Sequence, residues 1–410
     1  MLSSPLNAIN HSKYALGPIT TLKHTLFHLQ NTNNISPQLL PTITINKNQK
    51  LHYSIIQTVK LNNNKDIKIV EKLYRENNLS DNELKTLIET KNTEATKLLK
   101  KYADVTRQKY YGKKVFIRGL IEISSYCKND CLYCGIRRSN DKAERYRLTR
   151  KEILTCCKNG YNLGFRTFVM QSGEDGFLTD RFLCSVIKEI REKYPDCAIT
   201  LSFGERSYES YKRLKEAGAD RYLLRHEAAD PKLYEKLHPK KMSLDHRKQC
   251  LFNLKELGYQ VGAGFMVGAP YQTIEHLISD LRFLQSLQPH MIGIGPFIPH
   301  HNTQFANNKS GTVELTLKLL NIIRLLFPKV LLPATTALGT VTPNGRELGL
   351  QNGCNVVMPN LSPVKVRKKY DLYDNKICTG EEAAECRGCL NRRVKYAGYK
   401  IVSERGDCII

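Results

Sequence analysis

Short apolar runs alternate with helical patterns along most of this 410-residue chain, and this alternation restricts the fold more than any other feature. The runs expected as strands are 115–124, 167–172, 198–203, 221–227, 261–268, 291–296, 330–337 and 355–360. Strand–helix alternation predicts a parallel sheet. Eight such units over about 250 residues predict an α/β fold of the (β/α)8 TIM-barrel type. The alternative is a doubly wound open sheet, but no GxGxxG motif opens the first helix.

The rest of the chain falls into parts on either side of the predicted barrel. The expected parts are a leader (1–65), a helical segment (66–110), the barrel (111–375) and a cysteine-rich C-terminal segment (376–410). In the helical segment, Ser80 is followed three residues later by Glu83, which is the spacing of a helix capping box.

The leader has an unusual composition. It contains no Asp or Glu, but it has six Lys, four His and many Asn, Ser and Thr. A basic, acid-free, hydroxyl-rich leader is typical of import into a mitochondrion-type organelle, although this one lacks Arg. The alternative is a disordered, Asn-rich tail. We expect a targeting peptide.

The formal net charge of +24 is high, but the basic residues are interleaved with acids. No block of five like charges and no mixed basic and aromatic motif occurs. We therefore expect a basic surface rather than a site for nucleic acid or another polyanion. No stretch approaches 18 consecutive apolar residues, so no transmembrane helix and no membrane partner are expected.

Three cysteines follow the first expected strand, in the sequence "SSYCKNDCLYCGIRR". Cys127, Cys131 and Cys134 have the spacing C-x3-C-x2-C. A structural zinc site takes four protein ligands, and a four-iron cluster normally takes four cysteines. Three thiolates can hold three corners of a four-iron cube and leave the fourth iron free. The loop is expected at the C-terminal end of the barrel, where active sites of this fold lie. The alternative is a zinc knuckle with a remote fourth ligand.

Polar residues also stand at the ends of several other expected strands. Charged side chains inside a barrel are costly unless they are paired. Arg225 and Glu227 lie two residues apart on one expected strand and therefore share a side. They could form a structural ion pair at the barrel rim. They could instead contact a ligand, the carboxylate binding hydroxyls or an ammonium and the guanidinium binding a carboxylate. His226 and His238 are expected to be structural.

The cysteine motif, with Tyr133 before its last cysteine, resembles that of the radical S-adenosylmethionine superfamily. This resemblance implies that S-adenosylmethionine chelates the free iron and is cleaved by one electron from the cluster to a 5′-deoxyadenosyl radical. The sequence "QSGED" resembles the glycine-rich turn that contacts the methionine ammonium. The resemblance therefore implies cofactor contacts for Ser172, Gly173 and Glu174.

A closer resemblance covers roughly residues 105–400. The motifs that carry it are "CLYCGIRRSN", "MQSGED", "DRYLLRHEAADPKLYEKLHP", "GAGFMVGAPYQT", "MIGIGPFIPHHNT", "PATTALGT" and "GCNVVMPNLSPV". Together they resemble the FeFe-hydrogenase maturases of the branch that includes biotin synthase and methylornithine synthase. The further cofactor contacts that this implies are Tyr133 (beside the adenine), Ser202, Arg225, Glu227 and Arg247. The residues implied to line the substrate cavity are Ser172, Thr200, Thr335 and Thr336. One departure is Ala228, where the family pattern has Thr.

A second cysteine set lies near the C-terminus. Cys378, Cys386 and Cys389 have the spacing C-x7-C-x2-C, which by itself allows zinc or iron–sulfur. The resemblance favours an auxiliary iron–sulfur cluster, and because that cluster varies in the family we assign it no catalytic role. Cys408 is expected to be a bystander.

The resemblance implies an enzyme that builds the two-iron subcluster of the FeFe-hydrogenase H-cluster. Its implied substrate is a small organometallic precursor, a cysteine-bound Fe(CO)2(CN) unit. Its implied partners are other maturation factors and an electron donor such as ferredoxin. The leader then suggests a hydrogenosome-like organelle, with a chloroplast or the cytoplasm as alternatives.

Two other functions stay open. One is a methylornithine synthase-like or biotin synthase-like enzyme. The first would need a lysine pocket and the second would need cluster ligands inside the barrel. The other is a non-enzymatic iron–sulfur carrier, which would not need S-adenosylmethionine.

Overall fold

The computed structural model describes residues 65–380 and 387–409. The leader, apart from Lys65, lies outside the described residues, and so does Cys386. The chain is helical over 65–76, as the sequence predicts. The further helices are α3 (Asp81–Glu89), α4 (Thr93–Tyr111), α5 (Arg150–Asn162), α6 (Asp180–Lys193), α7 (Tyr208–Glu216), α8 (Pro231–Leu237), α9 (Leu244–Glu256), α10 (Ile274–Leu287), α11 (Val313–Leu326), α12 (Thr336–Val341), α13 (Gly345–Gln351), α14 (Val364–Arg367) and α15 (Arg387–Tyr396).

The strands are short. They are β1 (Lys114–Ile117), β2 (Gly119–Ser124), β3 (Thr167–Ser172), β4 (Ala198–Ser202), β5 (Arg221–Leu223), β6 (Gln260–Ala263), β7 (Met266–Val267), β8 (Met291–Ile292), β9 (Gly295–Pro296), β10 (Val356–Val357) and β11 (Lys400–Val402). Each of the first, fifth and sixth predicted strands is divided into two pieces, namely β1 and β2, β6 and β7, and β8 and β9.

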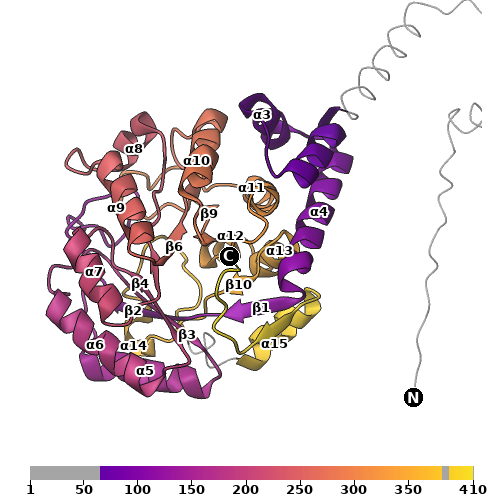
Figure 1. The fold of residues 1–410 in the computed structure, drawn as a ribbon. Helices are drawn as coiled ribbons and strands as arrows, with labels where there is room; N and C mark the ends of the chain where they lie inside the picture. The colour runs from indigo at the N-terminus through magenta and orange to yellow at the C-terminus, as the bar shows by residue number, and fades with distance from the viewer. Residues whose placement is uncertain (1–64, 381–386, 410) are drawn as a thin grey trace, which may run out of the picture. The chain divides into compact units, whose positions relative to one another are not determined.

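The parallel strands close into a barrel. Six of them form one sheet in the order β2-β3-β4-β5-β6-β8. Single parallel bridges continue the ring from Met291 to Leu331 and from Pro333 to Val356 of β10. A bridge from Asn360 to Leu120 then returns to the first strand. The predicted (β/α)8 barrel is thereby confirmed, with the helices surrounding the ring of strands in Figure 1.

The seventh predicted strand, 330–337, is wrong as a strand. Only Leu331 and Pro333 make bridges there. Pro333 has no N–H to donate to a ladder. Thr335 is already the N-cap of α12, because its hydroxyl accepts a hydrogen bond from the N–H of Leu338. Thr335 and Thr336 therefore lie at a helix N-terminus and not on a strand.

Helix caps and apolar faces fix the outer layer. The predicted capping box is present at α3, where Ser80 and Glu83 each accept a hydrogen bond from the other's backbone N–H. In α6 the buried residues Leu183, Val186, Ile187 and Ile190 recur at three- and four-residue spacing. This places one apolar face of the helix on the sheet. Burial of such faces around the barrel forms one large core.

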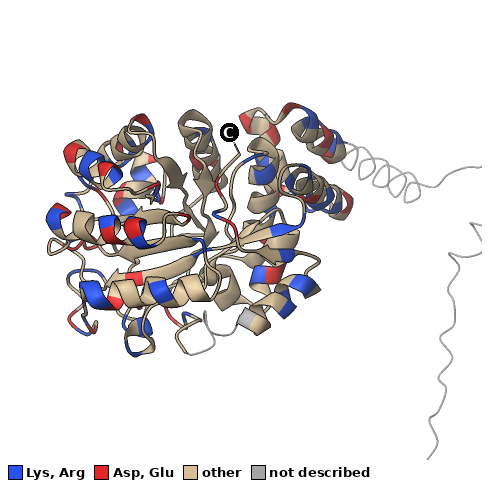
Figure 2. Ribbon diagram, turned by 60° about the horizontal axis from the view of Figure 1, so that its bottom comes forward, with Lys and Arg blue, Asp and Glu red and all other residues tan. Residues whose placement is uncertain are grey.

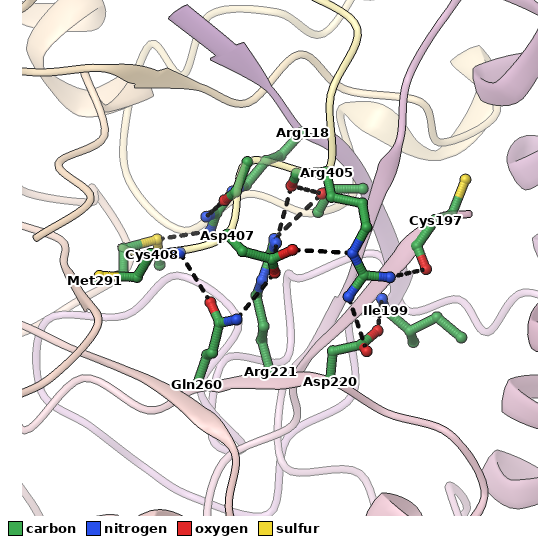
Figure 3. Close-up of polar contacts among 12 residues, drawn as sticks. Arg118, Cys197, Ile199, Asp220, Arg221, Gln260, Met291, Arg405, Asp407 and Cys408 are labelled. Atoms are coloured by element: carbon green, nitrogen blue, oxygen red, sulfur yellow. Dashed lines mark hydrogen bonds and ion pairs between the residues drawn. The ribbon is translucent and has the colours of Figure 1, made fainter. Parts of the chain in front are cut away.

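The C-terminal tail (403–409) covers the N-terminal end of the barrel, which we call the floor (Figure 3). It follows β11, a strand that the sequence did not predict and that pairs in parallel with β1. Asp407 pairs with the buried Arg221 at 2.5 Å and accepts from Gln260 at 2.9 Å. Arg405 pairs with Asp220 at 3.0 Å. The tail therefore ties the starts of several barrel strands together.

Charged residues lie mainly outside the barrel. Figure 2 shows Lys and Arg interspersed with Asp and Glu on the outer helices, whereas the central strands are mostly uncharged. This agrees with the interleaving read from the sequence. Within the part of the chain that the structure describes, no helix combines the length and the apolar character needed to cross a membrane.

Candidate active site

The three-cysteine loop lies directly against the "QSGED" turn. The N–H of Lys128 donates to the carbonyl of Glu174 at 2.8 Å. A side chain at Gly173 would come within 2.3 Å of the Tyr126 carbonyl oxygen and 2.7 Å of the Cys127 Cβ. Only glycine permits this close approach. The loop after β2 and the turn after β3 therefore form one surface at the C-terminal end of the barrel.

The spacing of the three thiols argues against a single ion. In tetrahedral zinc, two sulfurs are at most about 4.6 Å apart, since each Zn–S bond is roughly 2.3 Å. Among the described residues, a group of at least three His, Cys, Asp or Glu ligand atoms within 4.8 Å of one another occurs at His300, His301 and Asp374, but not at Cys127, Cys131 and Cys134. A four-iron cube holds its cysteine sulfurs further apart than one ion does. The three thiols are therefore not closed around a single ion in this structure, as a zinc knuckle would require.

Burial makes these thiols poor thiolates without a bound cation. Desolvation raises the pKa of Cys127, raises that of Cys131 well above its usual value and raises that of Cys134 to about 12. A bound iron cluster would supply the positive charge that favours the thiolate forms. The donor set therefore suits a metal cluster.

A cavity of about 350 Å³ opens beside the loop, and a second compartment of about 260 Å³ shares many of its walls. The structure brings most of the predicted site residues to these two compartments. They are Cys127, Cys131, Tyr133, Cys134, Ser172, Gly173, Glu174, Ser202, Arg225, Glu227, Arg247, Thr335 and Thr336.

Thr200 is the exception among these predictions. Its side chain is buried and lines a separate small pocket together with Arg118 and Arg221, on the floor side of the barrel. Thr200 lies in the middle of β4, two residues before Ser202, which does line the main cavity. Its position along the strand places it too deep in the barrel to reach that cavity.

The charged groups of the cavity are paired but not fully hydrogen-bonded. Arg225 and Glu227 form an ion pair at 3.0 Å, and Arg247 lies 2.6 Å from Glu205 and 3.7 Å from Glu174. Although burial alone would lower the pKa of Arg247, these carboxylates raise it above its usual value. The buried atoms without a hydrogen-bond partner in the described structure include Glu174 Oε2, Glu205 Oε1, Arg225 Nε and Nη2, Glu227 Oε2 and Arg247 Nε.

The three carboxylate oxygens lie 2.6–3.2 Å from a nitrogen of Lys128, Arg225 or Arg247, so they are ion-paired but lack hydrogen-bond geometry. Buried groups without hydrogen bonds are uncommon in folded proteins and call for an explanation. S-Adenosylmethionine carries an ammonium, a carboxylate, a sulfonium and ribose hydroxyls. Carboxylates and guanidiniums at the cavity wall match those groups, and the three cysteines match a cluster with one free iron. The residues present therefore fit the cofactor pair that the cysteine motif implies.

Tyr133 and two histidines are held by local contacts. The Tyr133 hydroxyl lies 3.1 Å from His238 Nε2, with the rings edge to face, and Tyr133 lines the second compartment. His226 is fully buried with its Nε2 3.2 Å from Asp280, and burial lowers its pKa to about 3. Burial also lowers the pKa of His238 to about 3. Both histidines are therefore neutral and serve as packing groups.

Several cavity residues were missed by the sequence reasoning. Glu122 on β2 and Lys376 form a buried ion pair at 2.7 Å in the cavity wall. Leu372 and Tyr373 also line both compartments. Glu122 carried a signal, because it is a lone acid within the apolar strand "GLIEIS". Lys376 carried none, since it lies in a segment without periodicity.

The second cysteine set is only partly described. Cys378 has a left-handed backbone (φ 65°), and its sulfur lies 2.7 Å from Arg346 Nη2. Cys389 lies on α15, with Arg392 Nη2 3.2 Å from its sulfur. Cys386 lies outside the described residues, so the auxiliary cluster stays a prediction.

Comparison with known proteins identifies the family. The model of the Radical SAM superfamily matches residues 121–284. The chain is 46% identical over 332 residues to the "[FeFe] hydrogenase maturase subunit HydE" of Thermotoga maritima, which covers 81% of this chain and 94% of that protein. It is 30% identical over 325 residues to the 3-methylornithine synthase of Methanosarcina barkeri, covering 78% and 90%.

Solved structures agree with this placement. The structure of methylornithine synthase (PylB) superposes with a TM-score of 0.71 at 29% identity, covering 82% of this chain and 97% of that one. The structure of HydG, a maturase of the [FeFe]-hydrogenase, has a TM-score of 0.72 at 22% identity, covers 88% of this chain and 80% of that one, and shares the fold. The three-cysteine loop, the cavity and the match over four-fifths of the chain lead to one assignment: this chain belongs to the [FeFe] hydrogenase maturase family of radical S-adenosylmethionine enzymes.

Proposed function

We propose that this enzyme acts on a small organometallic iron precursor, a cysteine-bound Fe(CO)2(CN) unit, during assembly of the two-iron subcluster of FeFe-hydrogenase. The observation that carries the proposal is the cavity beside the cysteine loop. Its lining includes Cys127, Cys131 and residues of the "QSGED" turn, together with Thr335, Thr336 and the Glu122–Lys376 pair. A small polar substrate can thus lie within reach of the cofactor. The 46% identity to a hydrogenase maturase supports the choice of reaction.

Different residues of the chain would bind the cluster, S-adenosylmethionine and the substrate. Cys127, Cys131 and Cys134 would hold the cluster, and Ser172, Gly173, Glu174, Ser202, Glu227 and Arg247 would hold S-adenosylmethionine. When bound, the reduced cluster supplies the electron that cleaves the sulfonium and gives the 5′-deoxyadenosyl radical. Arg225 pairs with Glu227 and faces the same cavity. Thr335 and Thr336 would orient the substrate.

Other maturation factors and an electron donor such as ferredoxin are the partners that this reaction requires. The radical reaction consumes one electron per cleavage, and the chain has no described group other than a bound cluster that could carry it. The donor must therefore approach the barrel from outside.

The biotin synthase-like alternative would need cysteine ligands inside the barrel. Cys197, Cys250 and Cys354 are buried, but none of them lines the cavity. Cys197 Sγ lies 3.9 Å from the Phe165 carbonyl at the floor side, and Cys250 Sγ lies 3.7 Å from His246 Nε2 on α9. The cavity therefore offers no second cluster site among the described residues, and this alternative lacks support.

The test is an anaerobic maturation of apo FeFe-hydrogenase with the other maturation factors, with and without this protein. Hydrogen evolution should depend on the intact protein and should fail with Cys127→Ser. Unchanged hydrogen evolution when the protein is omitted would refute the proposal. S-Adenosylmethionine cleavage without maturation would direct attention to methylornithine synthase-like substrates, and absence of S-adenosylmethionine binding would favour the carrier.

Two further parts of the proposal concern the ends of the chain. The acid-free composition of the leader supports import into a hydrogenosome-like organelle, and N-terminal sequencing of the native protein tests it. Cysteine spacing supports an auxiliary iron–sulfur cluster at Cys378, Cys386 and Cys389, which requires Cys389, disulfide-bonded in this structure, in its reduced form. Iron content of a Cys378→Ala variant, compared with wild type, tests that cluster.

A further inference from the structure

We call the C-terminal end of the barrel, where the cavity lies, the mouth. Lys376 reaches the cavity from residues 370–378, which we call the mouth segment. Its backbone is fixed at three places, by Gly135 N–H to the Leu372 carbonyl at 3.0 Å, Asp374 N–H to the Pro299 carbonyl at 3.0 Å, and Ile377 N–H to the Thr340 hydroxyl at 3.4 Å. The first of these joins the segment to the three-cysteine loop. The Lys376 side chain is thus positioned by rigid surroundings.

The Lys376 ammonium is buried and has one donor to spare. It donates to Glu122 Oε1 at 2.7 Å and to the Tyr370 carbonyl at 2.7 Å. Its side chain is 8% exposed, and that of Glu122 is 1% exposed. An ammonium has three N–H groups. Among the described residues no third oxygen or nitrogen acceptor is present, although the ammonium also lies 4.9 Å from the centre of the Tyr370 ring, and Lys376 lines the cavity.

Each oxygen of the paired carboxylate accepts one hydrogen bond from the protein. Glu122 Oε1 accepts from Lys376, and Oε2 accepts from Asn360 Nδ2 at 2.9 Å. The pair therefore presents to the cavity a cationic donor whose counter-charge is held in place by the protein. A ligand that meets this wall finds a hydrogen-bond donor that suits a carboxylate or another anionic group.

Stability alone does not account for such a pair. Two charges taken out of water lose hydration that their attraction repays only in part, and apolar residues of similar volume are often as stable or more stable. Ile121 and Ile123, which face the other side of β2, are fully buried, and Leu120 is the neighbour that precedes Glu122 on its own side of the strand. The charge pair therefore stands where an apolar pair would suffice for the fold.

We propose that Lys376 is a substrate-binding residue, whose free N–H donates to an anionic group of the substrate while Glu122 holds the ammonium in place. This inference rests on the proposed function. It assigns the cavity a second cation, next to β2, separate from Arg225, which follows β5 and lies three strands away from β2 in the barrel sheet. Two cations at separate places in the lining would orient a small anionic complex relative to the cluster loop.

The test varies the concentration of a synthetic cysteine-bound Fe(CO)2(CN) complex and measures the 5′-deoxyadenosine whose formation it stimulates in the reconstituted holoenzyme. Loss of a charged hydrogen bond should raise the half-saturating concentration by about 10- to 100-fold in Lys376→Met. The maximal rate should change far less. Lys376→Arg should recover most of the affinity because it keeps a cationic donor.

Lys369→Met is the matched control. Lys369 lies just before the mouth segment and pairs with Glu144 at 2.9 Å, but it is 37% exposed and lies outside the cavity. It should keep the half-saturation of the wild type. If Lys376→Met does so too, or if only its maximal rate falls, Lys376 does not bind substrate and the inference is wrong.

A double variant controls for the possibility that Lys376→Met alone misfolds. Glu122→Gln with Lys376→Met removes both charges, so that no buried charge is left unpaired. It should show the same rise in half-saturation, and wild-type affinity in it would refute the inference. A wild-type enzyme that the complex does not stimulate would instead refute the proposed function, because that result does not depend on Lys376.

Discussion

The mouth and the floor of this barrel both hold buried charges, but the hydrogen bonding of the carboxylates differs between the two ends. At the floor, both oxygens of Asp407 and both oxygens of Asp220 are hydrogen-bonded by protein groups (Figure 3). At the mouth, one oxygen each of Glu174, Glu205 and Glu227 lies 2.6–3.2 Å from a cationic nitrogen but has no hydrogen bond in the described structure. The carboxylates of the floor are therefore hydrogen-bonded at both oxygens and those of the mouth are not, although Arg118 and Arg221 at the floor each keep an Nε without a hydrogen bond.

We infer from this difference that the charges of the floor serve stability and those of the mouth serve function. Partly satisfied buried networks are costly to a fold, and such costs concentrate at functional sites. The tail supplies the groups that complete the floor, so changes there should weaken folding. A ligand is needed to complete the mouth, so changes there should weaken catalysis more than folding. The following predictions test that separation.

The largest effect is expected at the cluster loop. Cys131→Ala removes one of the three sulfurs that would hold the cluster, and S-adenosylmethionine cleavage should fall to background. The measurement is 5′-deoxyadenosine and methionine by chromatography under reducing, anaerobic conditions. Cys184→Ala is the control, because Cys184 lies on α6 outside the cavity, and it should cleave normally. Retained cleavage in Cys131→Ala would refute the cluster assignment.

The next effect is expected at the floor. A chain that ends at Val402 loses Arg405 and Asp407, and leaves Arg221 buried without its carboxylate partner. Breaking a fully buried ion pair costs about 3–5 kcal/mol of folding free energy, and because Asp407 is 37% exposed we expect a loss near the lower end. Denaturant unfolding of the shortened and full chains measures this cost. Equal unfolding midpoints would show that the floor network does not stabilise the barrel.

A matched pair of substitutions compares the two regions directly. Glu227→Gln and Asp407→Asn each replace an ion-paired carboxylate with an amide of nearly the same shape. Glu227→Gln should lower cleavage at least about 10-fold, the effect of losing a charged contact. Asp407→Asn should lose about 1–2 kcal/mol of stability, since its side chain is 37% exposed, and keep most of its activity.

Both quantities are measured on both proteins, by chemical denaturation and by 5′-deoxyadenosine formation. If the two variants lose stability and activity in the same proportion, the separation between mouth and floor fails. If the effects are reversed, the open groups at the mouth are structural and the tail takes part in catalysis.

The sequence predicted what is local and periodic. The alternation of strands and helices gave the barrel, and position after the first strand placed Cys127, Cys131 and Cys134 at its mouth. The depth of a residue within the barrel was harder to predict. Thr200 and Ser202 lie two residues apart on the same side of one short strand, but only Ser202 lines the cavity. A periodic pattern shows which side a residue faces, but not how deep it lies.

Contacts between distant segments could not be predicted. Lys376 meets a residue 254 positions away, and Arg221 meets one 186 positions away. Neither partner segment has a periodic pattern, so nothing in the sequence marks the mouth segment or the tail as part of the barrel. The way the ring of strands closes could not be predicted either. At Leu331 and Pro333 the backbone makes single bridges to its neighbours without forming a regular strand, and such irregular pairing has no sequence pattern.

The smallest expected effect is the pH dependence of the floor. Burial alone would raise the pKa of Asp407, but the Arg221 guanidinium overrides this, and the pKa is held at about 2, below the usual 3.8. A carboxyl with a lowered folded-state pKa contributes stability that is fully present above the unfolded-state value. That contribution is lost as the pH falls from about 4 to about 2. The stability difference between wild type and Asp407→Asn should therefore be constant above about pH 5 and shrink on acidification. Denaturant unfolding at a series of pH values measures it, and a difference that persists unchanged to pH 2 would mean that Asp407 stabilises the floor by its shape and hydrogen bonds rather than by its charge.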